Sequence, residues 1–116
     1  MTTIYRLNTI EKRIRTAVKN RSDNRFAADF DAVIAAYDYW LKHDMLVTDN
    51  MARIFEYLYL NPRNFAVSLV HACIELGLND STLRRYRRQF VEMFTICLNA
   101  SNKYRNSPYD IISVRK

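Results

Sequence analysis

Glycine is nearly absent from this chain, which has one glycine and two prolines among its 116 residues. Hairpins and meanders need tight turns, and tight turns draw on these residues for their unusual backbone angles. Phosphate-cradling and dinucleotide-binding loops need several glycines each, so their motifs are excluded as well. The scarcity of turn residues therefore predicts a fold that is nearly all helix.

Cysteine and histidine are also scarce, at two of each. Cys73 and Cys97 have no CxxC partner, and with His43 and His71 they form no series with the spacing of zinc ligands. We expect both cysteines to be reduced core residues, and we expect no metal and no cofactor. No nucleophile-and-base motif occurs, so the chain is predicted not to be an enzyme.

Long apolar runs are missing, since none approaches the roughly 20 residues that span a bilayer. The first residues, MTTIYRLN, lack the basic-then-apolar order of a signal peptide. We therefore expect a soluble, cytoplasmic protein without a membrane partner.

What the chain does contain is apolar residues, 49% of the total, enough for one domain with a real core. We predict a single small all-α domain of about five helices over residues 1–104. The residues that follow, 105–116, change in character and suggest an extended or flexible tail.

Apolar residues recur at intervals of three and four along five segments. The first helix, capped by Thr2 or Thr3, has its stripe at Ile4, Leu7, Ile10, Ile14 and Val18. The second, capped by Ser22 or Asp23, has an aromatic stripe that we expect at the centre of the core: Phe26, Phe30, Val33, Tyr37 and Trp40. The third starts at Thr48 or Asp49, the fourth runs from Pro62 to Leu76, and the fifth starts near Ser81. The fifth has its buried edge at Leu83, Tyr86, Phe90, Phe94 and Cys97.

The segment CIELGLNDSTLRRYRRQF, residues 73–90, joins the last two of these helices. Gly77 can take the positive φ that ends one helix, and the oxygens of Asn79, Asp80 or Ser81 can cap the next. The segment resembles the helix-turn-helix of DNA-binding proteins, without pointing to a specific family, and places such a unit near residues 65–98. The resemblance implies that the second helix lies in the major groove of DNA. The same pattern is also typical of any two antiparallel helices joined through a glycine, with the arginines as a solvated face.

Charge is divided along the chain. The net charge is +6 with an isoelectric point near 9.5, and residues 1–22, 23–56 and 57–116 carry +5, −4 and +5. Such a balance favours nucleic acid or an acidic protein surface as partner. If the first helix packs near the fifth, their basic faces merge into one surface; if it packs on the second, it neutralises the acidic segment.

We predict that the chain is a regulator of transcription or replication that binds double-stranded DNA. On the fifth helix, Thr82 and Arg85 are expected to approach bases, while Arg84 and Arg88 clamp phosphates. Arg87 lies nearer the core and is expected to pair with Asp80 or Glu92 if it does not bind DNA. The full set of predicted nucleic-acid-binding residues is Ser81, Thr82, Arg84, Arg85, Arg88 and Gln89 with Lys12, Arg15 and Lys19 of the first helix.

Tyrosine suggests an alternative function. Aromatic residues are enriched at protein interfaces as well as in cores, and four of them gather in the middle of the chain: Tyr39, Trp40, Tyr57 and Tyr59. If they form an exposed patch, the chain is a non-enzymatic interaction module, such as an inhibitor or adaptor, for a protein with an acidic surface. Closing the edge of a small core is the other reading of the same residues. If the chain binds DNA, we also expect a homodimer, because such proteins often dimerise to read two half-sites.

Overall fold

The computed structural model describes the backbone of residues 2–106 and the side chains of residues 6–100. Within that part of the chain every regular element is helical, which confirms the all-α prediction. The five α-helices are α1 (Thr2–Lys19), α2 (Ala27–Val47), α3 (Met51–Phe55), α4 (Leu69–Leu76) and α5 (Asp80–Asn106). Three short turns lie between them: a 3₁₀ turn η1 (Asn24–Phe26), a π-helical turn η2 (Glu56–Leu60) that continues α3, and a 3₁₀ turn η3 (Pro62–Asn64).

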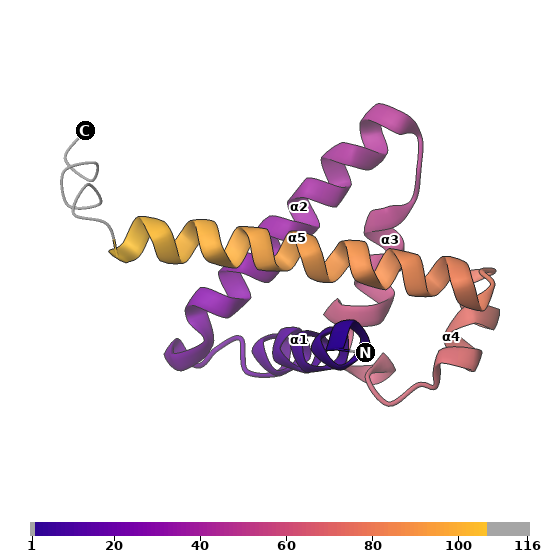
Figure 1. Ribbon diagram of the computed structural model, residues 1–116, viewed down its shortest axis with the longest axis horizontal. Coiled ribbons are helices and arrows are strands. Elements are labelled where there is room, and N and C mark those ends of the chain that lie inside the picture. Colours follow the sequence, from indigo (N-terminus) through magenta and orange to yellow (C-terminus); the bar gives the residue numbers. More distant parts are fainter. Residues whose placement is uncertain (1, 107–116) are drawn as a thin grey trace.

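Helix α5 runs the length of the molecule, and the other elements pack along it (Figure 1). Helix α2 crosses α5, with which it shares its largest interface, and α1 packs against both α2 and α5. Helix α4 lies at the N-terminal end of α5, to which a short turn joins it. The first helix therefore contacts both of the helices that the sequence offered as its neighbours.

The core is centred on Phe90 of α5. Its ring meets those of Phe55 and Tyr59 edge-on at centroid distances of 5.3 and 6.0 Å, and that of Trp40 at 5.4 Å. Such edge-to-face contacts add about 0.5–1.5 kcal/mol each to the burial of the rings. The aromatic stripe of α2 was expected at this place, but only Val33 and Trp40 of that stripe are buried, and the rings of its N-terminal half are partly exposed. The centre is instead shared between Trp40 of α2 and the rings supplied by α3, η2 and α5.

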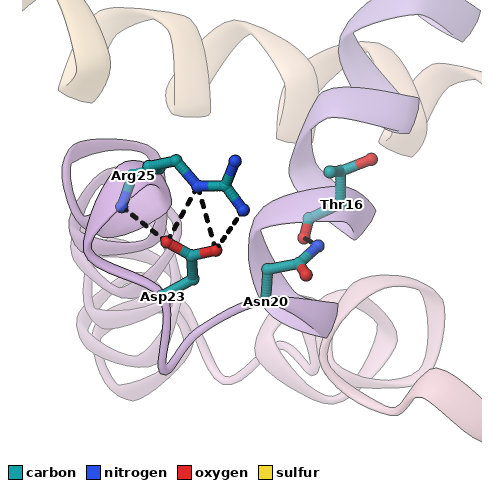
Figure 2. A network of polar contacts seen from close by, with 4 residues as sticks. All are labelled: Thr16, Asn20, Asp23 and Arg25. Carbon is teal, nitrogen blue, oxygen red and sulfur yellow. Dashed lines mark hydrogen bonds and ion pairs between the residues drawn. The ribbon is translucent and has the colours of Figure 1, made fainter.

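The connection between α1 and α2 is closed by side chains close in sequence (Figure 2). The Asn20 amide donates to the Thr16 carbonyl at 2.8 Å, which ends α1. Asp23 accepts the backbone N–H of Arg25 at 2.9 Å and the Arg25 guanidinium at 2.7 Å, and so caps the 3₁₀ turn η1. The predicted cap of the second helix was therefore wrong, because α2 begins after η1 with Phe26 at its N-cap and no side-chain cap. Hydrogen bonds from the side chain and backbone of Arg25 lower the pKa of Asp23.

The start of α3 differs from the prediction. Neither Thr48 nor Asp49 caps this helix, which begins at Met51. The Asp44 carboxylate of α2 accepts the backbone N–H groups of Met51 and Ala52 at 3.0 and 2.7 Å. Thr48 has a positive φ of 53° and ends α2, so the chain doubles back and brings the next helix under Asp44.

The fourth helix was predicted from Pro62 to Leu76, and its first half was wrong. Pro62 opens only the 3₁₀ turn η3, capped by Asn61, and α4 begins at Leu69. The Ser68 hydroxyl accepts the N–H of His71 at 3.1 Å and caps α4. Serine at this position competes with the backbone for hydrogen bonds and favours a new helix start over continuation of the old one.

The turn from α4 to α5 follows the sequence pattern. Gly77 has φ 68° and ends α4, and the N–H of Leu78 returns to the Cys73 carbonyl at 2.9 Å. Asn79 caps α5 by accepting the N–H of Thr82 at 2.8 Å. Helix α5 runs to Asn106, so residues 105 and 106, which were predicted to belong to the tail, are helical. The rest of the predicted tail, residues 107–116, lies outside the described part of the chain.

Candidate nucleic-acid interface

A buried ion pair joins α1 to α5. Arg87 donates to both carboxylate oxygens of Glu11, at 2.6 and 2.9 Å, and Tyr59 of η2 donates its hydroxyl to Glu11 at 2.5 Å. Glu11 is 2% exposed and Arg87 8%. The guanidinium also reaches the Asn8 amide oxygen at 3.3 Å. The pair fixes the rotation of α1 relative to α5, because a buried charge that loses its partner costs several kcal/mol.

Hydrogen bonding to Glu11 raises the pKa of Arg87, so its charge is secure. Burial first, and the negative charge of Glu11 second, raise the pKa of Tyr59 well above its usual value. The phenol therefore stays protonated and acts as a donor to Glu11.

The predicted partners of Arg87 were wrong, because Asp80 pairs with Arg84 at 2.7 Å and Glu92 is exposed. The sequence held a signal that was missed. Glu11 falls inside the apolar stripe Leu7, Ile14 and Val18, and Arg87 falls inside Leu83, Phe90 and Phe94, each with helical spacing. One acid and one base, each at a core position of its helix, indicate a buried pair.

Two adjoining hollows of about 470 and 330 Å³ lie beside this pair, and we call them together the α1–α5 groove. They share Asn8, Leu69 and Arg87 and so form one depression. The charged residues that line it are Glu11, Lys12, Arg15 and Lys19 of α1 and Asp80, Arg84, Arg87 and Arg88 of α5. Five of the nine residues predicted to bind nucleic acid, Lys12, Arg15, Lys19, Arg84 and Arg88, are thus brought to one groove.

The groove is electropositive. Its described lining holds six basic and two acidic side chains, a balance of +4. Glu11 neutralises Arg87 and Asp80 pairs with Arg84, while no ion pair between described residues engages Lys12, Arg15, Lys19 or Arg88. The sequence left open whether the basic face of the first helix joins that of the fifth or neutralises the acidic second helix. In the structure, the basic residues of α1 and α5 line the same groove. A link to the acidic segment exists as well, because Arg13 pairs with Asp29 of α2 at 2.8 Å.

The remaining four predicted residues do not line the described groove. Ser81 is exposed, and its hydroxyl donates to the Asn79 side chain at 3.0 Å. Thr82 and Gln89 are half-buried, and the Arg85 guanidinium is exposed with its carbon 5.5 Å from the centroid of the neighbouring Tyr86 ring. A helix turns by about 100° per residue, so α5 divides the predicted set between the groove and its outer face.

The four aromatic residues proposed as a partner surface do not form one patch. Trp40 is 5% exposed and Tyr59 fully buried, and both close the core. Tyr39 is 44% exposed and stands edge-on to the Trp40 ring at 4.9 Å. Tyr57 is half-buried in a separate hollow of about 400 Å³. Of these four residues, Tyr39 is therefore the one that is well exposed, and Tyr57 lies in a different part of the surface.

Exposed aliphatic side chains were not anticipated. At the C-terminal end of α2, Met45 is 83%, Leu46 84% and Val47 57% exposed, and on α4 Val70 and Ile74 are each 72% exposed. Contiguous exposed apolar side chains often mark interaction surfaces. Among the described residues, no helix combines the length and the hydropathy that a membrane span requires.

Three potential metal ligands, His43, Asp44 and Asp49, lie within 4.8 Å of one another. The Asp44 oxygens already accept two backbone N–H groups at the start of α3, and one of them lies 3.1 Å from His43 Nδ1. Helix capping accounts for this grouping. Both cysteines are free and half-buried, and burial raises the pKa of Cys97.

Comparison of the chain with models of protein families, with curated proteins and with solved structures found no match.

Proposed function

We propose that the chain is a small regulator that binds double-stranded DNA through the α1–α5 groove and the adjoining outer face of α5. The observation that supports this best is the convergence of basic side chains from two helices that lie far apart in sequence. Lys12, Arg15, Lys19 and Arg88 face one depression without an acidic partner among the described residues. Phosphate contacts of this kind supply most of the non-specific affinity for DNA.

The α4–turn–α5 unit supports a role for the start of α5 in binding the major groove of DNA. The cap at Asn79 and the turn at Gly77 set α5 off from α4 at a defined point. Arg85 and Ser81 then lie on exposed positions of the first turns of α5, where a recognition helix contacts base edges. Asp80 lowers the positive charge at the N-terminal end of α5 and pairs with Arg84 at 2.7 Å. We therefore assign the phosphate contact to Arg88 in preference to Arg84.

The test is fluorescence anisotropy of a labelled mixed-sequence duplex, titrated with protein at about 50 and about 200 mM salt. Wild type is compared with Arg85→Gln/Arg88→Gln, which removes two charges from α5. The matched control is Lys42→Gln/Arg53→Gln, which removes two exposed charges that do not line the described groove. The control keeps the net charge of the two variants equal, so any difference between them is due to position.

We expect wild-type binding to weaken steeply with salt, with a log–log slope reduced by about 0.9 for each phosphate contact that the α5 variant removes. The control variant should bind nearly as wild type does. Absence of duplex binding at low salt, or equal loss in both variants, would contradict the proposal. Light scattering of the free protein and of the complex tests the predicted homodimer.

A protein-interaction module is the second candidate, favoured by the apolar end of α2. Met45, Leu46 and Val47 are exposed in succession, close in sequence to Tyr39. A partner protein that binds there should still co-purify with the chain after nuclease treatment. It should no longer co-purify with the variant Met45→Gln/Leu46→Gln. A partner that nuclease removes, or that the α2 variant retains, contradicts this candidate.

A further inference from the structure

Arg15 occupies an unusual position for a basic residue of α1. Its Nε donates to the Leu58 carbonyl at 3.4 Å, and its guanidinium carbon lies 5.3 Å from the Tyr59 ring centroid and 5.7 Å from that of Phe65. The side chain is half-buried, whereas Lys12 and Lys19 of the same helix are exposed. Two rings and a carbonyl therefore fix the guanidinium, and an arginine held in this way loses little entropy when it binds a ligand.

The contacts of Arg15 leave most of its donors available. A guanidinium has five N–H groups, and the recorded hydrogen bond uses the one on Nε. No described acid pairs with it, although Glu11 lines the same hollow. The two oxygens of Glu11 accept three hydrogen bonds from Arg87 and Tyr59, so this acid is already satisfied.

The surroundings of Arg15 fit an anion. The hollow of about 470 Å³ is also lined by Lys12, Thr16 and Lys19, which follow one another at helical spacing along the same side of α1. A guanidinium fork binds two phosphate oxygens at once, ammonium groups add charge from the rim, and a threonine hydroxyl can donate a further hydrogen bond. Carboxylates have fewer acceptor oxygens for such a set of donors.

We infer that Arg15, with Lys12 and Lys19, forms a phosphate-binding site at the α1 end of the α1–α5 groove. The inference rests on the proposed function in one respect, since it assigns the phosphate to a nucleic-acid backbone. A free phosphate group offers the same chemistry. The two sources are separated by the probes used below.

The experiment follows the Arg15 Nε–Hε signal by NMR during separate titrations with inorganic phosphate and with the mixed-sequence duplex. Anisotropy of the duplex is measured in parallel on Arg15→Lys, which keeps the charge but loses the fork, and on Lys19→Gln, which changes an exposed residue only. Arg6→Gln serves as the control, because Arg6 is an exposed base of α1 that does not line the described groove. Circular dichroism verifies that each variant is folded.

We expect the duplex to shift the Arg15 signal, and Arg15→Lys to weaken duplex binding about tenfold, the scale of one charge-assisted contact. Lys19→Gln should lower the salt slope by about one unit, and Arg6→Gln should change neither quantity. Duplex binding that is unchanged in Arg15→Lys and Lys19→Gln but lost in Arg85→Gln/Arg88→Gln overturns this site and leaves the proposed function standing. A signal shifted by inorganic phosphate, without duplex binding, supports the site and overturns its nucleic-acid source. A signal that neither probe shifts overturns the site altogether.

Discussion

The buried pair of Glu11 and Arg87 allows a stability test whose size follows from the structure. Glu11→Gln conserves the shape of the side chain but leaves Arg87, 8% exposed, without its counter-charge. Breaking a buried pair in this way costs about 3–5 kcal/mol, against about 5–15 kcal/mol for the whole stability of a typical domain. We expect the variant to lose about a fifth or more of its free energy of unfolding.

Urea unfolding followed by tryptophan fluorescence measures this loss, because Trp40 is the sole tryptophan and is 5% exposed against Phe90. The exposed pair of Arg84 and Asp80 provides the control, since Arg84→Gln should cost less than about 1 kcal/mol.

A double variant separates the pair from its surroundings. Glu11→Leu/Arg87→Met removes both charges and keeps apolar volume, so it should be more stable than Glu11→Leu alone. The interaction energy from this double-mutant cycle should exceed about 2 kcal/mol, within the range for directly contacting residues. If Glu11→Gln costs less than about 1 kcal/mol, or if the two changes are additive within about 0.5 kcal/mol, α1 is not anchored to α5 through this pair and the reasoning fails.

Three further predictions concern single residues. Gly77→Ala should cost about 1 kcal/mol in urea unfolding, because φ is 68° and no atom within 4 Å would clash with the added carbon; an unchanged midpoint would contradict the positive φ. Asp44→Ala should cost about 1–2 kcal/mol by losing the cap of α3, whereas the exposed Asp38→Ala should be neutral, and equal effects would argue against the cap. The raised pKa of Tyr59 means that the folded state keeps a proton that the unfolded chain releases near pH 10, so this contribution to stability is present below about pH 10 and is lost above it. The midpoint temperature of thermal unfolding should therefore fall less steeply between pH 8 and 11 in Tyr59→Phe than in wild type. Parallel plots of this temperature against pH would contradict the assignment.

Local signals in the sequence predicted much of the fold. The single glycine and the oxygens at Asn79 stop and start helices through contacts within a few residues, and the structure has them in these roles. Such contacts depend on the neighbouring backbone alone. The cap of α3 was missed because it depends on a longer contact: it comes from Asp44, seven residues before Met51 and across a reversal of the chain.

The candidate site was less predictable than the helices. The nine residues chosen for nucleic-acid binding were all basic or polar side chains expected on outward faces, but only five of them line the groove. The role of Arg15 could not be predicted from the sequence, because Tyr59 and Phe65, which its guanidinium contacts, lie far from it along the chain. The exposed apolar end of α2 could not be predicted either, since its residues continue an apolar pattern that no element in the described part of the chain covers.

The sequence by itself determined that this chain is helical, basic at both ends and acidic between, because composition, helical periodicity and charge order are properties of the chain alone. The tertiary structure decided that the basic residues of α1 and of the first turns of α5 meet. Glu11 and Arg87 are 76 residues apart, and their pairing in the core turns α1 so that Lys12, Arg15 and Lys19 face the same groove as Arg88. The packing of helices depends on which side chains fit together in three dimensions, and neither stripe specifies its partner on its own.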